Sequence, residues 1–264
     1  MENVEEIRVG DGESYLHIIP ALQDNYIYLL SRERNAVIVD PGDPDPVLSL
    51  VEAKQYRLMS ALITHHHGDH TGGNEQIHKK TGCRIIGPED ERIPCLQQSV
   101  ADGEELVFDP FKIEVISTQG HTRPHVAYFF RDLNFLFSGD LLFGAGCGRL
   151  TEGTAEEMFA SLQKIKKLPE TTRIFFGHEY TEKNLEFALL VEPEAPAAVR
   201  DRLEKVRKIR EEKRPTAPSD LATEKATNPF LRTDDEHLQK VLGMEDASPL
   251  EVFVRLRSMR DEHR

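Results

Sequence analysis

The stretch His65-His66-His67-Gly68-Asp69-His70 determines how the rest of this 264-residue chain is interpreted. It follows an apolar segment, residues 58–63, and precedes the polar residues 71–74. This order predicts a strand, then a loop rich in metal ligands, then the start of a helix. A purification tag is excluded because the run is internal and contains glycine and aspartate. For the run taken alone, a surface cluster of histidines that binds metal adventitiously remains an alternative.

The spacing inside this run separates its side chains into groups. Along an extended loop successive side chains alternate, so His65 and His67 point one way and His66 points the other. As the chain turns into a helix, Asp69 and His70 fall on a new face. The ligands are imidazole and carboxylate without a thiol, which suits Zn, Fe or Mn better than a structural thiolate site.

Three further candidate ligands, His121, Asp140 and His178, lie later in the chain. Each comes directly after a glycine at the end of a predicted strand. Glycine allows the backbone to turn sharply there, so the next side chain can point toward a shared site. Taken alone, His121 or His178 could equally well be an ordinary histidine that binds no metal. Only the combination of candidate ligands indicates a metal centre.

The candidate ligands number seven: His65, His67, Asp69, His70, His121, Asp140 and His178. Two metals that share one bridging carboxylate need three further ligands each, which makes seven. Asp140 is the predicted bridge, because a carboxylate has two oxygens and a neutral imidazole cannot span two metals. A water between two metals has its pKa lowered toward about 7, so the predicted nucleophile is a bridging hydroxide. One metal can also stabilise an oxyanion, and the set predicts hydrolysis of an acyl or phosphoryl bond.

Composition narrows the class of protein. Hydrophobic residues make up 39% of the chain, enough for a core, and no segment has the roughly 18 apolar residues of a membrane helix. The formal net charge of −13 argues against nucleic acid or an anionic membrane as the main partner. The acidic start, residues 1–6, shows neither a secretory signal nor a transit peptide. The three cysteines imply neither a disulfide framework nor a zinc ribbon, so a cytoplasmic location is predicted.

The hydrophobic pattern predicts an α/β domain over residues 1–178 and a helical domain over residues 179–264. Alternating apolar runs predict strands at residues 15–20, 26–31, 36–40, 58–63, 83–86, 105–108, 111–117, 126–130 and 135–137. Helical spacing, caps and proline breaks predict helices from residue 45 and over residues 74–80, 154–168, 183–191, about 199–210, 235–242 and 250–259.

The residues 64–70, with the later Gly-His-Thr, Ser-Gly-Asp and Gly-His, resemble the metallo-β-lactamase superfamily. This resemblance implies a four-layer αββα sandwich with the metals at one edge. The chain is more specifically similar to the glyoxalase II (hydroxyacylglutathione hydrolase) family, which implies a smaller all-helical C-terminal domain that contributes to glutathione binding. The segments that carry this similarity are residues 24–26, 146–149, 152–154, 177–181, 226–230 and 256–261.

The resemblance implies which residues hold two divalent metal ions, with Zn expected first and Fe or Mn as alternatives. One metal is assigned to His65, His67 and His121, and the other to Asp69, His70 and His178, with Asp140 bridging. Asp69 and Asp140 are thereby also the predicted catalytic carboxylates. The implied reaction converts S-D-lactoylglutathione, or another 2-hydroxyacylglutathione, and water into the 2-hydroxy acid and glutathione. In that family the reaction is the second step of methylglyoxal detoxification. We expect a monomer whose partner is the small-molecule glutathione thioester, with no nucleic acid and no membrane as partner.

The resemblance also places glutathione near five residues: Arg149, Tyr180, Asn184, Arg257 and Arg260. Glutathione carries two carboxylates, and an acidic protein needs a few arginines to hold them in forked hydrogen bonds. Arg257 and Arg260 are three residues apart on a predicted helix and so share a face. Without the resemblance, a solvated arginine would be the ordinary interpretation of either one.

Three positions depart from the family pattern. Thr151 stands where the family commonly has an aromatic residue, Pro124 replaces an expected glycine after His121, and Arg260 is often lysine. None of them is a predicted ligand, so the departures concern substrate affinity more than reaction type.

The sequence is also compatible with other functions. One is a persulfide dioxygenase with a single iron, a branch that also handles glutathione but that we expect to lack the helical C-terminal domain. Others are a lactonase or β-lactamase of the same superfamily, and a metal-binding protein without catalysis. Cys147 is interpreted as a small buried residue, and His66, His78 and His125 are not counted as ligands.

Overall fold

The computed structural model describes residues 4–10 and 12–263, so the start of the acidic N-terminal segment lies outside the described residues. The chain divides into two compact units, Met1–Ser117 with Pro124–Gly139, and Thr118–Arg123 with Asp140–Arg264. Each unit is described by itself. The boundary expected after residue 178 rests on sequence composition and stays a prediction.

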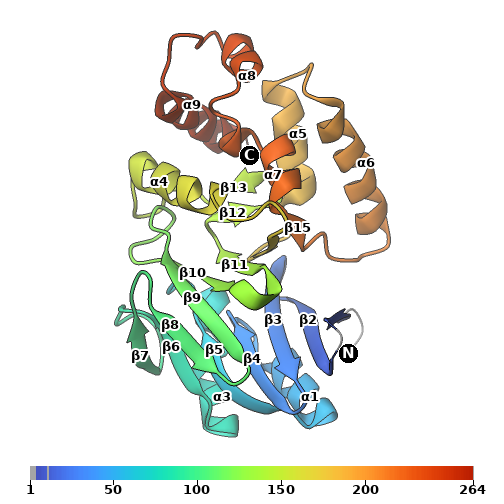
Figure 1. The fold of residues 1–264 in the computed structure, drawn as a ribbon, viewed down its shortest axis with the longest axis vertical. Coiled ribbons are helices and arrows are strands. Elements are labelled where there is room, and N and C mark those ends of the chain that lie inside the picture. The colour runs from blue at the N-terminus through green and yellow to red at the C-terminus, as the bar shows by residue number, and fades with distance from the viewer. Residues whose placement is uncertain (1–3, 11, 264) are drawn as a thin grey trace. The chain divides into compact units, whose positions relative to one another are not determined.

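The first unit contains a seven-stranded sheet in which the strands follow chain order (Figure 1). Strands β1 to β4 pair antiparallel, and β4 to β7 pair parallel. Parallel neighbours need a crossover, and helices supply two of them. The strands are β1 (Glu5–Val9), β2 (Ser14–Ala21), β3 (Asn25–Arg32), β4 (Asn35–Val39), β5 (Arg57–Leu62), β6 (Arg84–Pro88) and β7 (Leu96–Val100).

The crossover helices are α1 (Pro44–Lys54), followed after β5 by the short α2 (Gly68–Thr71) and α3 (Asn74–Thr81). Asp43 begins α1 by accepting the Asp45 backbone N–H, and Gly82, at a φ of 71°, ends α3. The apolar faces of α1 and α3 pack on the sheet in one buried cluster, whose members include Ile38, Ala61 and Ile85 from the strands and Val47, Leu50 and Ile77 from the helices.

A second antiparallel layer completes this unit: β8 (Glu105–Phe108), β9 (Phe111–Ser117), β10 (Val126–Phe130) and β11 (Phe135–Gly139). Every residue of β10 and β11 is buried. Contacts between the layers are direct, since the rings of Tyr28 and Phe137 lie 5.3 Å apart and the Tyr128 hydroxyl donates to the Ile63 carbonyl at 2.8 Å. The first unit is therefore a sandwich of two sheets.

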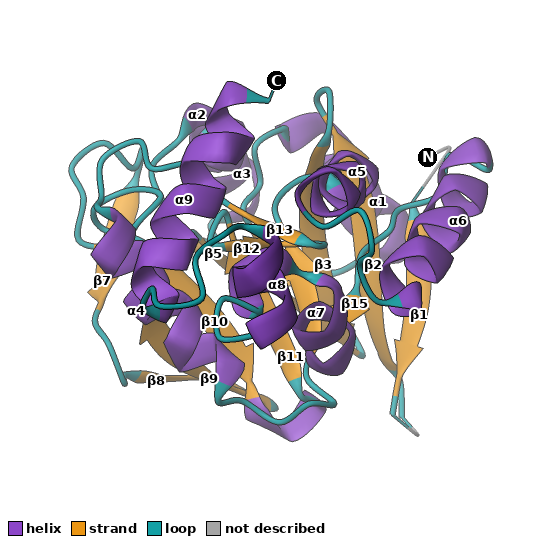
Figure 2. Cartoon of the chain, turned by 90° about the horizontal axis from the view of Figure 1, so that it is seen from above, coloured by secondary structure: helices purple, strands orange, loops and turns teal. Residues whose placement is uncertain are grey.

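Helices dominate the second unit, as the colouring of Figure 2 shows. Thr154 and Ser248 each form a capping box with the glutamate three residues on, which fixes where α4 and α9 begin. The elements are β12 (Leu142–Phe143), β13 (Gly146–Cys147), α4 (Ala155–Lys166), β14 (Arg173–Phe176), α5 (Thr181–Val191), α6 (Ala197–Glu211), β15 (Ser219–Asp220), α7 (Leu221–Thr227), α8 (Glu236–Val241) and α9 (Pro249–Glu262).

The core of this unit lies between α5 and α6, where Leu185 and Ala188 pack on Val199, Leu203 and Val206. Rings of Phe159 on α4 and Phe253 on α9 contact each other at 5.8 Å. A fully paired charge is also buried, because Arg232 donates to both carboxylate oxygens of Glu192.

Every strand and helix that the sequence predicts is present, with ends that differ by a few residues. The sequence did not predict β1, β7, α2, α7 or the two-residue strands β12, β13 and β15, and it indicated β14 only as the end of a strand before His178. Among the described residues, no helix has both the length and the hydrophobicity of a membrane span.

Candidate metal centre

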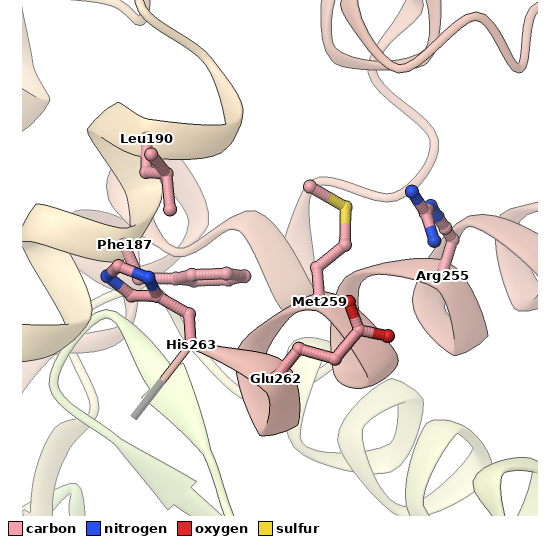
Figure 3. A pocket seen from close by; sticks show the side chains of 6 residues that line it. All are labelled: Phe187, Leu190, Arg255, Met259, Glu262 and His263. Carbon is pink, nitrogen blue, oxygen red and sulfur yellow. The ribbon is translucent and has the colours of Figure 1, made fainter.

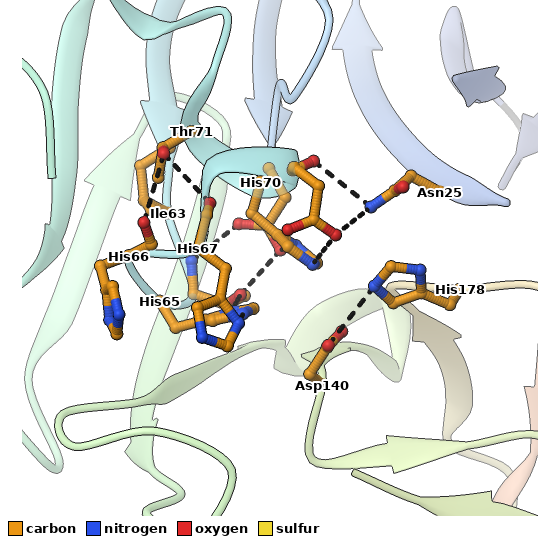
Figure 4. Close-up of polar contacts among 12 residues, drawn as sticks. Asn25, Ile63, His65, His66, His67, His70, Thr71, Asp140 and His178 are labelled. Carbon is orange, nitrogen blue, oxygen red and sulfur yellow. Dashed lines mark hydrogen bonds and ion pairs between the residues drawn. The ribbon is translucent and has the colours of Figure 1, made fainter. Parts of the chain in front are cut away.

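The histidine run of the first unit lies where the sequence predicted, between the end of β5 and the end of α2 (Figure 4). His65 and His70 are buried, and His67 and Asp69 are half-buried. His65 Nε2 lies 3.1 Å from His67 Nδ1, and His70 Nε2 lies 3.5 Å from an Asp69 carboxylate oxygen. The four predicted ligands of this unit therefore form close pairs.

Asp40, which was not among the predicted site residues, holds this group in place. Its buried carboxylate accepts the backbone N–H and the hydroxyl of Thr64, and it lies 3.0 Å from His70 Nδ1. The Thr64 hydroxyl is also 3.0 Å from His65 Nδ1. Because the Nδ1 atom of His70 faces a carboxylate, its Nε2 is the nitrogen left for a metal, as in carboxylate–histidine–metal arrangements.

Asp69 is positioned by Asn25 at the start of β3. The Asn25 amide donates to the Asp69 carboxylate at 2.9 Å. Close approach of α2 also requires Gly42, since a Cβ there would lie 1.8 Å from the Asp69 carbonyl oxygen. Asn25 belongs to one of the segments that carry the family resemblance, but the sequence alone gave it no role.

In the second unit, His121, Asp140 and His178 lie together. The Nε2 atoms of His121 and His178 are each 3.4 Å from the same oxygen, Oδ2 of Asp140 (Figure 4 shows the latter pair). His121 Nδ1 donates to the Arg149 carbonyl at 2.8 Å. The ring of Tyr180 stacks on that of His178, with centroids 4.9 Å apart and planes 2° from parallel.

These distances fit a bound divalent ion. Two ligand atoms about 2.1 Å from a tetrahedral metal are about 3.4 Å apart. The ligand pairs within each unit have spacings of 3.1 to 3.5 Å, and the donors are imidazole and carboxylate. The described residues thus contain histidine–aspartate clusters able to bind divalent metal ions. How the seven residues are shared between metals stays a prediction.

The predicted glutathione residues of the second unit differ in their exposure. Arg149 is exposed, Tyr180 and Arg260 are half-buried, and Asn184 and Arg257 are buried. The Arg257 guanidinium donates to the Cys147 carbonyl at 3.0 Å and to Asp261 at 2.8 Å, and it lies over the Phe230 ring. These interactions are internal to the protein, so a direct contact of Arg257 with substrate stays a prediction.

The side chain of Arg260 is more exposed than that of Arg257. Its guanidinium lies over the Phe187 ring and contacts the Asn184 side-chain oxygen at 3.4 Å. Burial, followed by the neighbouring charge of Arg257, lowers the Arg260 pKa from the usual arginine value. Arg149 also contributes to this lowering, so three positive charges gather in one region of the second unit.

A hollow of about 280 Å³ lies between α5 and α9 beside this region (Figure 3). None of the five predicted glutathione residues lines it. Its lining residues are Phe187, Leu190, Arg255, Met259, Glu262 and His263.

Thr151, the departure from the family pattern, is bonded to the backbone beside the ligands. Both its hydroxyl and its backbone N–H donate to the His121 carbonyl. The three histidines not counted as ligands have other neighbours: His66 lies 3.3 Å from Asp90, and His125 stacks on His65. His78 bonds the Cys83 carbonyl at 2.8 Å.

Comparison with known proteins places most of the chain in one family. A family model described as "Metallo-beta-lactamase superfamily" matches residues 22–178, and one described as "Hydroxyacylglutathione hydrolase C-terminus" matches residues 179–263. The chain is 44% identical to hydroxyacylglutathione hydrolase of Rhodospirillum rubrum, over 93% of this chain and 97% of that protein. It belongs to the hydroxyacylglutathione hydrolase family.

A second relative of the same name, from Aliivibrio fischeri, is 45% identical over 92% of this chain and 97% of its own length. Among solved structures, ETHE1 from Myxococcus xanthus matches with a TM-score of 0.62 at 20% identity, covering 97% of this chain and 89% of that one. At that identity the match shows the fold alone. These comparisons confirm the predicted metallo-β-lactamase fold with an added C-terminal domain. They also confirm the predicted family, hydroxyacylglutathione hydrolase, and with it the enzyme class.

Proposed function

We propose that this chain hydrolyses the thioester of S-D-lactoylglutathione, and of other 2-hydroxyacylglutathiones, to release the 2-hydroxy acid and glutathione. The observation that carries this proposal is the similarity to curated hydroxyacylglutathione hydrolases, at 44–45% identity over nearly the full length of both chains. In this role the chain would complete the second step of methylglyoxal detoxification.

For this reaction the seven predicted ligands would hold two divalent metal ions. His65, His67 and His121 would bind one, and Asp69, His70 and His178 the other, with Asp140 bridging. When bound, such ions lower the pKa of a coordinated water and polarise a carbonyl oxygen. The donors accept Zn, Fe or Mn, and Zn is our first expectation.

The protein's own contribution would be to fix the ligands. Asp40 faces Nδ1 of His70, and the Arg149 carbonyl accepts the Nδ1 proton of His121. In both histidines the other ring nitrogen, Nε2, then points toward a carboxylate ligand of the same unit. This carboxylate is Asp69 for His70 and Asp140 for His121. Preorganised ligands need no reorientation when the substrate arrives.

Substrate recognition would use the positive region of the second unit. Glutathione carries two carboxylates, and Arg149 and Arg260 are the two predicted contacts whose guanidinium groups are not fully buried. Tyr180 and Asn184 would border the same region. With a formal net charge of −13, the protein needs such a local cluster to hold an anionic substrate.

We further expect a monomeric cytoplasmic enzyme that binds neither nucleic acid nor membrane. Its acidic composition and its three unpaired cysteines support this expectation.

The test is hydrolysis of S-D-lactoylglutathione by protein of known metal content, beside an Asp140→Ala variant. Wild-type protein should release glutathione rapidly, and the variant should lose both turnover and bound metal. Absence of turnover in protein with two metals per chain would overturn the proposal. Oxygen uptake with glutathione persulfide would then favour the dioxygenase alternative.

A further inference from the structure

The segment Gly144-Ala145-Gly146-Cys147-Gly148-Arg149 of the second unit, called here the glycine loop, is held along its backbone by buried side chains. Each of its first four residues has one backbone group bonded to a different side chain. Asn184 donates to the Gly144 carbonyl, Glu224 accepts the Ala145 N–H, Asn228 donates to the Gly146 carbonyl, and Arg257 donates to the Cys147 carbonyl, at 2.8 to 3.0 Å. The loop therefore has its shape imposed from outside.

Packing restricts the loop as tightly as these hydrogen bonds do. A Cβ at Gly144 would lie 2.3 Å from the Thr181 hydroxyl, and one at Gly146 would lie 2.3 Å from the Asn184 amide. Between them Ala145 has a φ of 56°, a left-handed conformation that a residue with a Cβ rarely adopts. Its methyl group is fully buried in the α5–α6 core, so the surrounding contacts must offset that strain.

The far end of the glycine loop contacts two of the predicted ligands. The Arg149 carbonyl accepts the Nδ1 proton of His121 at 2.8 Å. The Gly148 N–H donates to the Leu141 carbonyl, and its α-carbon packs on the backbone of Asp140 so closely that a Cβ would lie 2.0 Å from the carbonyl oxygen. A change in the loop's shape therefore reaches both His121 and Asp140.

Glu224 on α7 is the least expected member of this arrangement, because it is a carboxylate with no exposed surface. One of its oxygens accepts the Ala145 N–H at 2.8 Å and the Asn228 amide at 3.2 Å. The other accepts from the guanidinium of Arg202. Burying a charge is unfavourable unless it is paired and hydrogen-bonded, and here both oxygens are used. The Glu224 carboxylate thereby supplies the hydrogen-bond acceptor for the buried backbone N–H of Ala145, the residue with the strained conformation.

We propose that Glu224 and Asn228 are positioning residues of the metal centre. They fix the backbone of Ala145 and Gly146, and the glycine loop transmits that position to His121 through the Arg149 carbonyl. The hydrogen bonds of these two side chains go to Ala145, Gly146, Phe230, Arg202 and each other, and none goes to a predicted metal ligand or a predicted glutathione residue. The inference rests on the proposed use of His121 as a metal ligand.

The test compares Glu224→Gln with Glu170→Gln in full-length, zinc-loaded protein labelled with ¹⁵N-histidine. Glutamine at 224 places a donor against one of the three donors that the carboxylate now accepts. Glu170 is exposed and pairs with Lys225, which lies on the same helix as Glu224. The control therefore makes the same glutamate-to-glutamine change beside α7 without touching the glycine loop. The measurements are the His121 Nδ1–H resonance, zinc affinity by chelator competition, and thermal unfolding.

In Glu224→Gln we expect the His121 Nδ1–H resonance to shift or exchange faster with water. We also expect zinc affinity to fall at least about tenfold, as when an outer partner of a ligating histidine is lost. The Glu170→Gln protein should match wild type in both. A folded Glu224→Gln protein with the wild-type resonance and zinc affinity, and only a lower unfolding temperature, would show a purely structural role and overturn the proposal.

If Glu224→Gln does not fold, Asn228→Ala serves as the second variant, because it leaves the Glu224–Arg202 pair intact. The same two changes are expected, and wild-type values in that folded protein would overturn the proposal. Neither the resonance nor the affinity depends on substrate. A wild-type protein that fails to hydrolyse S-D-lactoylglutathione would therefore contradict the proposed function without deciding this inference.

Discussion

Replacing Gly148 by alanine should damage catalysis much more than one added methyl group suggests. The new Cβ would lie 2.0 Å from the Asp140 carbonyl oxygen, and real Cβ atoms essentially never approach other heavy atoms within 3.0 Å. Either the glycine loop or Asp140 must therefore move by at least 1.0 Å. Metal–ligand distances tolerate only about 0.2 Å, and a misplacement of about 1 Å can reduce the rate about 100-fold. We expect kcat/KM to fall about 100-fold, and stability to fall by about 1–3 kcal/mol from overpacking.

The assay is release of the glutathione thiol from S-D-lactoylglutathione, with metal content and urea unfolding measured on the same protein. Gly12→Ala is the matched control, since a Cβ there meets nothing within 4 Å. This variant should leave activity, metal content and urea unfolding unchanged. A folded Gly148→Ala protein with wild-type kcat/KM would refute the reasoning. It would mean that the loop can move without moving the ligands.

Three further predictions concern stability and metal binding. Burial lowers the pKa of His17 from 6.5 to about 4. As the pH falls, His17 is therefore protonated in the unfolded state before it is protonated in the folded state. Stability should therefore fall as the pH drops from about 6.5 to about 4, by about 3 kcal/mol, and urea titrations of His17→Phe should show a flatter dependence than wild type. Arg232→Met removes both guanidinium hydrogen bonds from the buried carboxylate of Glu192 and leaves only His237, 3.7 Å away, beside it. It should reduce the free energy of unfolding by about 3–5 kcal/mol, whereas a loss below about 1 kcal/mol would contradict this. Asp40→Asn removes the carboxylate facing His70 and should weaken zinc binding about 10- to 100-fold in equilibrium dialysis, and an unchanged affinity would count against Asp40 as a support.

The secondary structure was predictable wherever the determining interactions are local. Thr154 and Ser248 identify the helix starts of α4 and α9 because their capping boxes involve residues only three apart. In contrast, β7 (Leu96–Val100) consists of polar residues between two apolar ends, and it becomes a strand by pairing with β6. The two-residue strands β12 and β13 likewise depend on tertiary contacts that no local pattern specifies.

The candidate ligands were predictable because imidazole and carboxylate side chains follow glycines at strand ends, an unusual pattern. The residues that support them give no such signal. Asp40, before Pro41, has the sequence pattern of an ordinary turn, and Glu224 lies in a short charged helix. Their roles depend on complete burial beside partners 24 and 79 residues away in sequence, which only the folded structure specifies. Arg257 shows the opposite case, since the family resemblance implies a substrate contact whereas its buried guanidinium bonds the glycine loop.

The burial of Cys147 has a consequence for the chemical durability of the protein. Burial raises the pKa of the Cys147 thiol, and that of Cys83, so neither sulfur is readily ionised. Because the thiolate is the reactive form, oxidants and electrophilic aldehydes should spare the cysteine inside the glycine loop. Cys95 is exposed in the first unit, and it would react first. A fluorophore or spin label directed to cysteine should therefore attach at residue 95 and leave the loop unmodified.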